Sequence, residues 1–208
     1  MTAYWMDRVK VGDKAEYAKY RQAAFALAPE VPHQPLSVDG RREVLEGPND
    51  FDKFVIWSYP IFERAVAHHE SPAYQAAARF RRESGSVNEV VVAEGVEGAP
   101  HGETFGAYWA AFVTVHNPEQ YQKYVDAAAA LLPYTPAKVL VGGGHYQAME
   151  SASGANRFIL VGWPTFDEAV AQFHSEGYKA AAAHRRSGAG DVWIAVVEAT
   201  STPPDPFG

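Results

Sequence analysis

The chain has 208 residues, of which 47% are hydrophobic and 21% are charged, and its net charge is −7. A negative charge without any basic block argues against a nucleic-acid-binding surface. The absence of cysteine excludes disulfides, thiolate metal sites and cysteine nucleophiles. An apolar run of about 18 residues is missing, as is an N-terminal basic segment followed by an apolar one, so we expect neither a membrane span nor secretion. We predict a cytoplasmic protein.

Hydrophobic periodicity predicts four strands and two helices in the first half of the chain. In chain order these are strand 3–11, a helix between Asp13 and Pro29, strands 36–46 and 53–59, a long helix from Phe62 to Phe80, and strand 88–95. Asp13 can cap the first helix, and Gly47-Pro48-Asn49-Asp50 is a turn sequence between the two central strands.

The second half of the chain repeats the first without a gap, at the offset that separates Ala3 from Ala107. Matching segments are Ala3-Tyr4-Trp5 with Ala107-Tyr108-Trp109, Tyr17-x-Lys19-Tyr20 with Tyr121-x-Lys123-Tyr124, Pro60-x-Phe62 with Pro164-x-Phe166, and Arg81-Arg82 with Arg185-Arg186. Such self-similarity indicates two copies of one structural unit. We therefore predict a first repeat at 1–96, a linker at 97–105, a second repeat at 106–200 and a flexible tail at 201–208.

The order βαββαβ in each repeat is typical of the ferredoxin-like arrangement, an antiparallel sheet with both helices on one face. The other face of each sheet needs cover. In strand 3–11, Trp5 and Val9 lie on one face and Tyr4 and Met6 on the other, so both faces are apolar. We predict an α+β fold in which the two sheets form one barrel of eight antiparallel strands, with four helices outside.

Several short motifs resemble those of a known family. They are Ala3-Tyr4, Asp13 with Tyr17 and Tyr20, Glu46-Gly47, Tyr59-Pro60, Ala65, Ser71-Pro72-x-Tyr74 and Arg81. The pattern resembles the DUF1330 family of the dimeric α/β-barrel superfamily. The resemblance implies that the usual homodimer is fused here into one polypeptide. The superfamily includes cofactor-free monooxygenases, lactone isomerases, polyketide cyclases and haem enzymes, so the fold is a poor guide to the chemistry.

Positions at which the two repeats differ are candidates for a specialised site. The second helix carries His69 and Phe80 in the first repeat, where the second repeat has Phe173 and His184. On one continuous helix, residues 11 apart share a face, and we expect that face to point at the sheet. A core histidine bonded to a backbone carbonyl is the alternative to a catalytic one.

Asp7 lies on the strand face assigned to the helices, and its counterpart is Ala111. An unpaired buried carboxylate is unfavourable, so Asp7 could orient His69 or act as a base with a raised pKa. An ion pair with Arg81 or Arg82, or exposure to solvent, would be the structural alternatives. We predict His69 and Asp7 as the catalytic pair. The expected substrate-binding residues are Trp5, Trp57, Phe80, Trp109, Phe173 and His184.

Histidine clusters raise the question of a metal site. Two groups of residues could supply metal ligands: His68, His69 and Glu70, or His145, His174 and His184. Adjacent helical residues diverge by about 100°, so His68 and His69 cannot easily share one ion. We predict no metal.

The leading hypothesis is a small-molecule enzyme that works without an organic cofactor. It would be an isomerase, a cyclase or a monooxygenase-like catalyst on an apolar, aromatic or polyketide-like substrate. The alternative is a non-catalytic protein that binds a hydrophobic ligand in the same pocket. A purely structural dimerisation module is disfavoured because the fusion already buries the sheet interface. The protein would be a monomer, as a pseudo-dimer, or a homodimer.

Overall fold

The computed structural model describes residues 1–27, 33–150 and 154–200. Repeat one (1–96) contains β1 (Ala3–Lys10), α1 (Lys14–Ala26), β2 (Gln34–Val38), β3 (Arg42–Glu46), β4 (Lys53–Tyr59), α2 (Phe62–Glu70), α3 (Pro72–Glu83) and β5 (Val87–Glu94). Repeat two (106–200) contains β6 (Ala107–Val115), α4 (Pro118–Ala129), the 3-10 helix η2 (Leu132–Tyr134), β7 (Lys138–Gly142), β8 (Tyr146–Ala148), β9 (Arg157–Trp163), α5 (Phe166–His174), α6 (Glu176–Arg186) and β10 (Gly190–Glu198).

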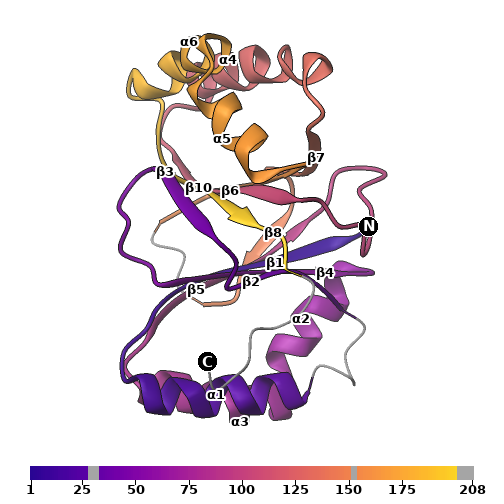
Figure 1. Ribbon diagram of the computed structural model, residues 1–208, viewed down its shortest axis with the longest axis vertical. Helices are drawn as coiled ribbons and strands as arrows, with labels where there is room; N and C mark the ends of the chain where they lie inside the picture. Colours follow the sequence, from indigo (N-terminus) through magenta and orange to yellow (C-terminus); the bar gives the residue numbers. More distant parts are fainter. Residues whose placement is uncertain (28–32, 151–153, 201–208) are drawn as a thin grey trace.

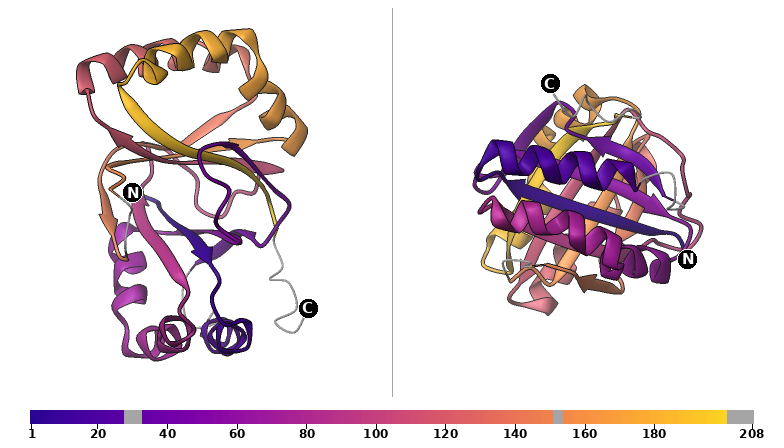
Figure 2. Two further views of the ribbon diagram at one scale, coloured as in Figure 1. Left: turned by 90° about the vertical axis from the view of Figure 1, so that its left-hand side faces the viewer. Right: turned by 90° about the horizontal axis from the view of Figure 1, so that it is seen from below.

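Two antiparallel sheets form the centre of the molecule, and the helices of each repeat cover one outer face (Figure 1). The strand order is β2-β4-β1-β5-β8 in the first sheet and β3-β10-β6-β9-β7 in the second. Seen from below, α1 and α3 lie side by side over the first sheet (Figure 2). The fold is the expected dimeric α/β barrel, built within a single chain.

The repeats exchange edge strands, which the sequence did not indicate. The expected single strand 36–46 is wrong: β2 stays in the first sheet, whereas β3 pairs with β10 of the second. Likewise β8 of repeat two pairs with β5 of the first sheet. The chain turns between the sheets at Asp39 and at its counterpart Gly143, both left-handed, with φ of 54° and 82°. The described part of the chain therefore has ten strands instead of eight.

Backbone hydrogen bonds join the two sheets at equivalent corners. Thr200 N donates to Leu36 O at 3.1 Å, and its counterpart Val96 N donates to Leu140 O at 2.9 Å. Because these groups are the continuation of β10 and β5, the sheets close toward a barrel with protected edges.

The predicted burial of both faces of the first strand is confirmed. Tyr4 and Met6 lie in the apolar core between the sheets, and Trp5 and Val9 pack in the core between the first sheet and its helices. Asp7 follows the same alternation and faces the helices.

The predicted long second helix is two helices in each repeat. Ser71 adopts an extended conformation, with ψ of 140°, and its side chain accepts a hydrogen bond from Tyr74 N. A residue before proline avoids the helical region, and Pro72 is favoured at the first position of the next helix. Ser175 forms the same cap in repeat two. The break turns α3 and α6 relative to α2 and α5. The prediction that positions 69 and 80 share one helix face is therefore wrong.

Candidate functional site: two unequal cavities

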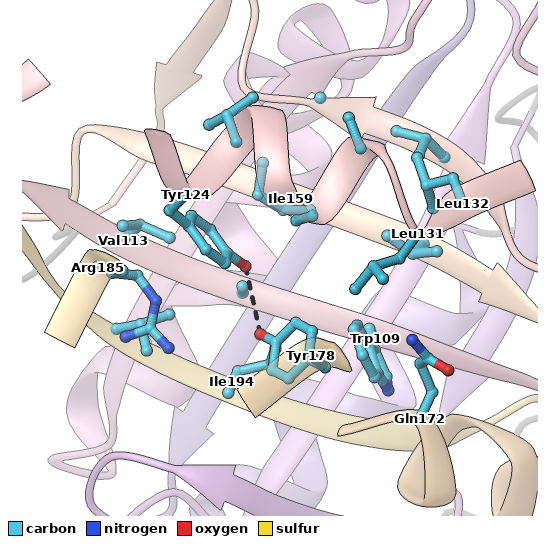
Figure 3. A pocket seen from close by; sticks show the side chains of 18 of the residues that line it. Trp109, Val113, Tyr124, Leu131, Leu132, Ile159, Gln172, Tyr178, Arg185 and Ile194 are labelled. Carbon is cyan, nitrogen blue, oxygen red and sulfur yellow. Dashed lines mark hydrogen bonds between the residues drawn. The ribbon is translucent and has the colours of Figure 1, made fainter. Parts of the chain in front are cut away.

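Each repeat has a cavity between its sheet and its helices, and the two cavities occupy equivalent places. The repeat-two cavity has a volume of about 290 Å³ and is mostly apolar (Figure 3). Its walls come from β6, β9, β10, α4, α6 and the segment around η2, and they include Trp109, Ile159, Val161, Ile194, Leu131 and Leu132. This cavity approaches the size of small-molecule pockets in proteins.

The repeat-one cavity is much smaller, at about 70 Å³, and more polar. Its lining residues combine aromatic, acidic and imidazole side chains: Trp5, Asp7, Tyr17, Tyr20, Arg21, Phe25, His33, Asp39, Trp57, Tyr59, His68 and Tyr74. The shared scaffold therefore carries two sites of different chemistry.

Four pairs of equivalent lining residues account for the difference in volume and polarity. Large or charged side chains of repeat one are replaced by small apolar ones in repeat two, in the pairs Asp7 and Ala111, Arg21 and Val125, Phe25 and Ala129, and Trp57 and Val161. The surrounding backbone is shared, so the smaller side chains leave unfilled volume in repeat two.

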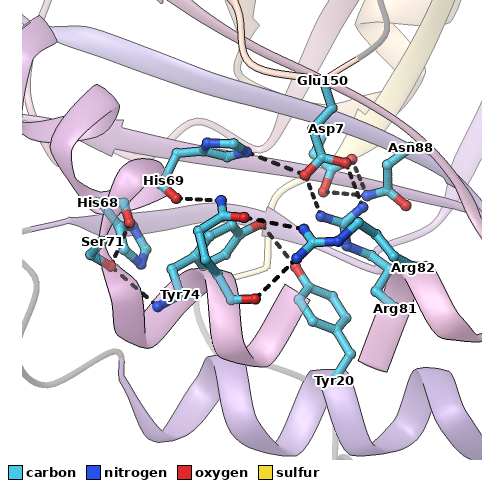
Figure 4. Close-up of polar contacts among 11 residues, drawn as sticks. Asp7, Tyr20, His68, His69, Ser71, Tyr74, Arg81, Arg82, Asn88 and Glu150 are labelled. Carbon is cyan, nitrogen blue, oxygen red and sulfur yellow. Dashed lines mark hydrogen bonds and ion pairs between the residues drawn. The ribbon is translucent and has the colours of Figure 1, made fainter. Parts of the chain in front are cut away.

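A buried polar network lies beside the repeat-one cavity (Figure 4). Asn88 Nδ2 donates to both carboxylate oxygens of Asp7, at 3.0 and 3.3 Å. Arg81 donates from Nη1 to Glu150 Oε2 at 2.8 Å and from Nη2 to Glu150 Oε1 at 2.5 Å. Glu150 Oε1 also lies 3.2 Å from His69 Nε2. Glu150 follows β8, so repeat two supplies an essential part of a network in repeat one.

Burial shapes the ionisation of this network. Burial is the largest effect on Asp7 and raises the pKa of its carboxyl to about 7, while the nearby charge of Arg81 opposes this rise. Burial would also raise the pKa of Glu150, but hydrogen bonds from Arg81 and His69 outweigh it and lower that pKa to about 2. Glu150 is thus ionised at neutral pH, whereas the carboxyl of Asp7 titrates near neutral pH.

Repeat two keeps the ion pair but not the acidic centre. Arg185 donates to Glu46 at 2.8 and 2.9 Å, and Arg186 donates to Glu46 Oε2 at 2.6 Å. Glu46 belongs to β3 of repeat one, so this pair also links the repeats. Ala111 and Val192 replace Asp7 and Asn88. The remaining polar groups near the cavity include the hydroxyls of Tyr124 and Tyr178, 3.2 Å apart.

The structure does not bring the predicted catalytic pair together. His69 contacts Glu150, whereas Asp7 is bound by Asn88, and no hydrogen bond or ion pair joins His69 to Asp7 in the described part of the chain. His69 is buried and does not line the repeat-one cavity; the neighbouring His68 does. The predicted direct pairing is therefore wrong. A catalytic role for either residue stays a prediction.

The predicted substrate-binding residues differ in whether they line a cavity. Trp5 and Trp57 line the repeat-one cavity, and Trp109 lines the repeat-two cavity. Phe173 is buried beside Trp109, with ring centroids 6.2 Å apart. Phe80 and His184 are exposed and line neither cavity, because the breaks at Ser71 and Ser175 turn their helix face away from the sheet.

Other lining residues were missed by the sequence analysis. Tyr124, Tyr178 and Arg185 line the repeat-two cavity and are identical to their counterparts in repeat one, so a comparison of the positions that differ does not indicate them. Val161 and Val125 are ordinary apolar residues, and only their larger counterparts indicate that volume is left open. In the ranges that the structure describes, no group of three or more His, Asp or Glu side chains could hold a metal ion. No helix among those residues is long and apolar enough to cross a membrane.

The paired sheets with outer helices and a cavity under each helical layer define a dimeric α/β barrel. The profile of the DUF1330 family, a domain of unknown function, matches residues 2–96 and 106–200. The chain belongs to this family, with two tandem copies of the domain. No curated protein matches the sequence.

Solved structures with the same fold have little sequence in common with this chain. A candidate monooxygenase from Fusobacterium nucleatum subsp. nucleatum is 10% identical with a TM-score of 0.55, over 95% of this chain and 91% of that one. An anthrone oxidase-like protein is 12% identical with a TM-score of 0.52, over 96% and 91% of the two chains. At these identities the similarity establishes the fold, which recurs in enzyme-like proteins, and leaves the substrate open.

Proposed function

We propose that this protein binds an apolar, aromatic or polyketide-like small molecule in the repeat-two cavity. The observation that carries the proposal is the cavity itself: about 290 Å³, walled by aromatic and aliphatic side chains. Binding sites for small molecules are typically apolar hollows of roughly this size with a few polar groups that fix orientation. Burial of an apolar ligand there would supply the main favourable term in binding.

The polar groups at this cavity suit a ligand with a carbonyl or hydroxyl group. Tyr124 and Tyr178 share one hydrogen bond between their hydroxyls, so one hydroxyl hydrogen of the pair remains available to a ligand oxygen. The side-chain amide of Gln172 lies near Trp109 in the lining of the cavity (Figure 3). Arg185 is held by Glu46 and contributes a fixed wall.

The same lining favours binding over acid–base catalysis in this cavity. None of the described residues that line it is Asp, Glu or His. Burial raises the pKa of Tyr121 to about 12 and the pKa of Tyr178 well above its usual value. These tyrosines therefore stay protonated at neutral pH and are poor bases.

Binding of 2-naphthol, followed by calorimetry and by the fluorescence of Trp109 and Trp163, tests the proposal. Both tryptophans line the repeat-two cavity, so saturable binding should change their emission. Val161→Trp introduces the residue that repeat one has at Trp57 and should reduce the affinity at least tenfold. Val87→Trp adds the same ring at an exposed position and should leave the affinity unchanged. Equal affinity in wild type and Val161→Trp would reject this cavity as the site.

The second candidate is cofactor-free acid–base catalysis, as an isomerase, a cyclase or a monooxygenase-like enzyme, with Asp7 as the base and His69 as acid or base. One observation favours it: Asp7 is a cavity-lining carboxyl with a pKa of about 7, which suits general base catalysis at neutral pH. The small repeat-one cavity and the separation of His69 from Asp7 weigh against it.

Oxidation of anthrone by dissolved oxygen, with anthraquinone and water as products, tests the monooxygenase-like form of this candidate against a binding protein. A monooxygenase-like enzyme should form anthraquinone faster than the buffer does, and a binding protein should not. Because the two cavities are lined by residues of different repeats, loss of turnover in Asp7→Asn and His69→Gln would place the reaction in repeat one. Turnover that survives both substitutions would remove these residues from the mechanism.

A further inference from the structure

The repeat-one cavity combines aromatic walls with a buried carboxylate. Trp5, Trp57, Tyr17 and Tyr20 line it together with Asp7, whose exposure is only 4%. Aromatic rings attract cations through their negative faces, and the attraction grows when the cation is removed from water. A carboxylate among aromatic side chains is therefore a setting for a positive charge.

Within the described residues, Asp7 has fewer hydrogen bonds than a buried carboxylate can accept. Both oxygens share the single side-chain amide of Asn88, although a carboxylate offers about four acceptor positions. The guanidinium of Arg81, whose charge acts on Asp7, is bound in a bidentate pair by Glu150. With these three groups ionised, the cluster of Asp7, Arg81 and Glu150 carries one excess negative charge.

The other charged groups at the cavity contact residues other than Asp7. Asp39 is paired with Lys53 at 2.7 Å and with Arg21 at 3.7 Å. His68 lies 2.6 Å from the hydroxyl of Tyr59, and burial lowers the pKa of its imidazole to about 4. His68 is thus neutral at physiological pH and adds no positive charge beside Asp7.

We propose that the repeat-one cavity is a second binding site, for a small protonated amine whose ammonium group pairs with Asp7. The volume of about 70 Å³ limits the occupant to the size of methylammonium or of the end of a longer alkylamine. The half-buried residues Arg21, Phe25, His33 and Trp57 form part of the lining.

Repeat two is the internal control for this proposal. It lacks the carboxylate at Ala111, its hydrogen-bond partner at Val192 and the indole at Val161. Two arginines face its one glutamate, Glu46. We therefore expect no cation to bind in the repeat-two cavity. The amine site is thus independent of the apolar site proposed above.

Calorimetric titration of the full chain with methylammonium chloride at pH 8 tests the site, with methanol as the neutral analogue and potassium chloride at equal ionic strength. We expect saturable binding of methylammonium, and no saturable binding of methanol or of potassium ions. Tetramethylammonium should bind at least tenfold more weakly, because it exceeds the cavity and has no N–H donor. Absence of saturable methylammonium binding, or equal binding of methanol, would overturn the proposal.

Binding should also depend on pH, because Asp7 must be ionised. With its pKa at about 7, the affinity should rise roughly tenfold between pH 6 and pH 8. Among the described residues, the charged or titratable groups that act on Asp7 include Arg81, Glu150, Asp39, Tyr17, Tyr20 and Tyr74, and Arg21, His33 and His68 line the same cavity. Of these, Glu150 has a pKa of about 2 and the tyrosine pKa values are raised, so neither group changes charge in this interval. A constant affinity from pH 6 to pH 8 would contradict the role of Asp7.

Two variants locate the binding. Asp7→Asn should abolish it, and the double variant Asp7→Ala with Asn88→Val, which installs the residues of repeat two, should do the same if the single variant is poorly folded. Methylammonium should leave the 2-naphthol affinity of the wild-type protein unchanged. The two sites can therefore fail separately: retained amine binding in both variants would overturn the amine site and leave the apolar site untouched.

Discussion

The two repeats use one scaffold for two opposite environments. Arg81 with Glu150 in repeat one and Arg185 with Glu46 in repeat two are equivalent, and each pair crosses between the repeats. Beside this shared pair, repeat one has Asp7 and Asn88, whereas repeat two has Ala111 and Val192. The positions that join the repeats are kept, and the positions that line the cavities differ. A homodimer has two identical pockets because its two chains have one sequence. In the fused chain the two pockets can differ.

The shared ion pairs should have the largest effect on stability. Glu150→Ala leaves the guanidinium of Arg81, which is 1% exposed, without its partner, and should lower the free energy of unfolding by about 3–5 kcal/mol. Glu46→Ala should have a similar effect through Arg185. Urea denaturation measures both. Glu83→Ala, which breaks an exposed pair with Arg79, is the control and should change stability by less than about 1 kcal/mol.

A comparable loss is expected when the acidic residue of repeat one is transferred to repeat two. Ala111→Asp places a carboxyl under the apolar cavity without the amide that Asn88 provides, and should destabilise the fold by roughly 3–4 kcal/mol at pH 8. Adding Val192→Asn should recover part of this loss and should reduce 2-naphthol binding further. If Ala111→Asp alone is neutral in urea denaturation, the repeat-two cavity is more hydrated than its lining indicates.

The reciprocal change in repeat one should stabilise the protein. Folding raises the pKa of Asp7 from 3.8 to about 7, so the folded state holds a proton that the unfolded chain releases between these values. This contribution is fully present below about pH 4 and is lost as the pH rises through about 7. Asp7→Asn should therefore raise the free energy of unfolding at pH 8 by roughly 2–4 kcal/mol. At pH 4 the gain should nearly vanish, and a gain independent of pH would show that ionisation is not its cause.

The sequence predicted the fold far better than the site. The duplication, the strand alternation at Tyr4 and Trp5, and the turn residues were enough to predict two sheets with helices outside. The exchange of β3 and β8 was not predicted: 36–46 was expected to be one strand, although it contains the turn sequence Asp39-Gly40, and the left-handed backbone at Asp39 divides it. Ser71 followed by Pro72 is a sequence typical of a helix start. The apolar periodicity continues across it, and one long helix was therefore predicted.

The partner of Asp7 depends on strand register, which the sequence does not contain. Asp7 lies opposite Val90 and Val9 lies opposite Asn88, so Asn88 is the diagonal neighbour of Asp7 on the same face of the sheet. His69 is directed instead to Glu150, a residue 81 positions away along the chain. The larger cavity left a signal in the sequence, namely the replacement of Trp57 and Phe25 by Val161 and Ala129. These replacements reduce side-chain volume in repeat two. The catalytic prediction instead followed the polar residues Asp7 and His69, which belong to repeat one.

The smallest effects are expected at Phe80 and His184, the exposed members of the two histidine–phenylalanine pairs that are swapped between the repeats. Phe80 is 36% exposed and Phe173 is 6% exposed, although a continuous helix would bury residues 69 and 80 on one face. Phe80→Gln should therefore change the free energy of unfolding by no more than about 0.5 kcal/mol, and His184→Gln should behave alike. Phe173→Ala in the same urea assay should cost about 3–5 kcal/mol. A loss of that size in Phe80→Gln would mean that α2 and α3 act as one buried helix in solution.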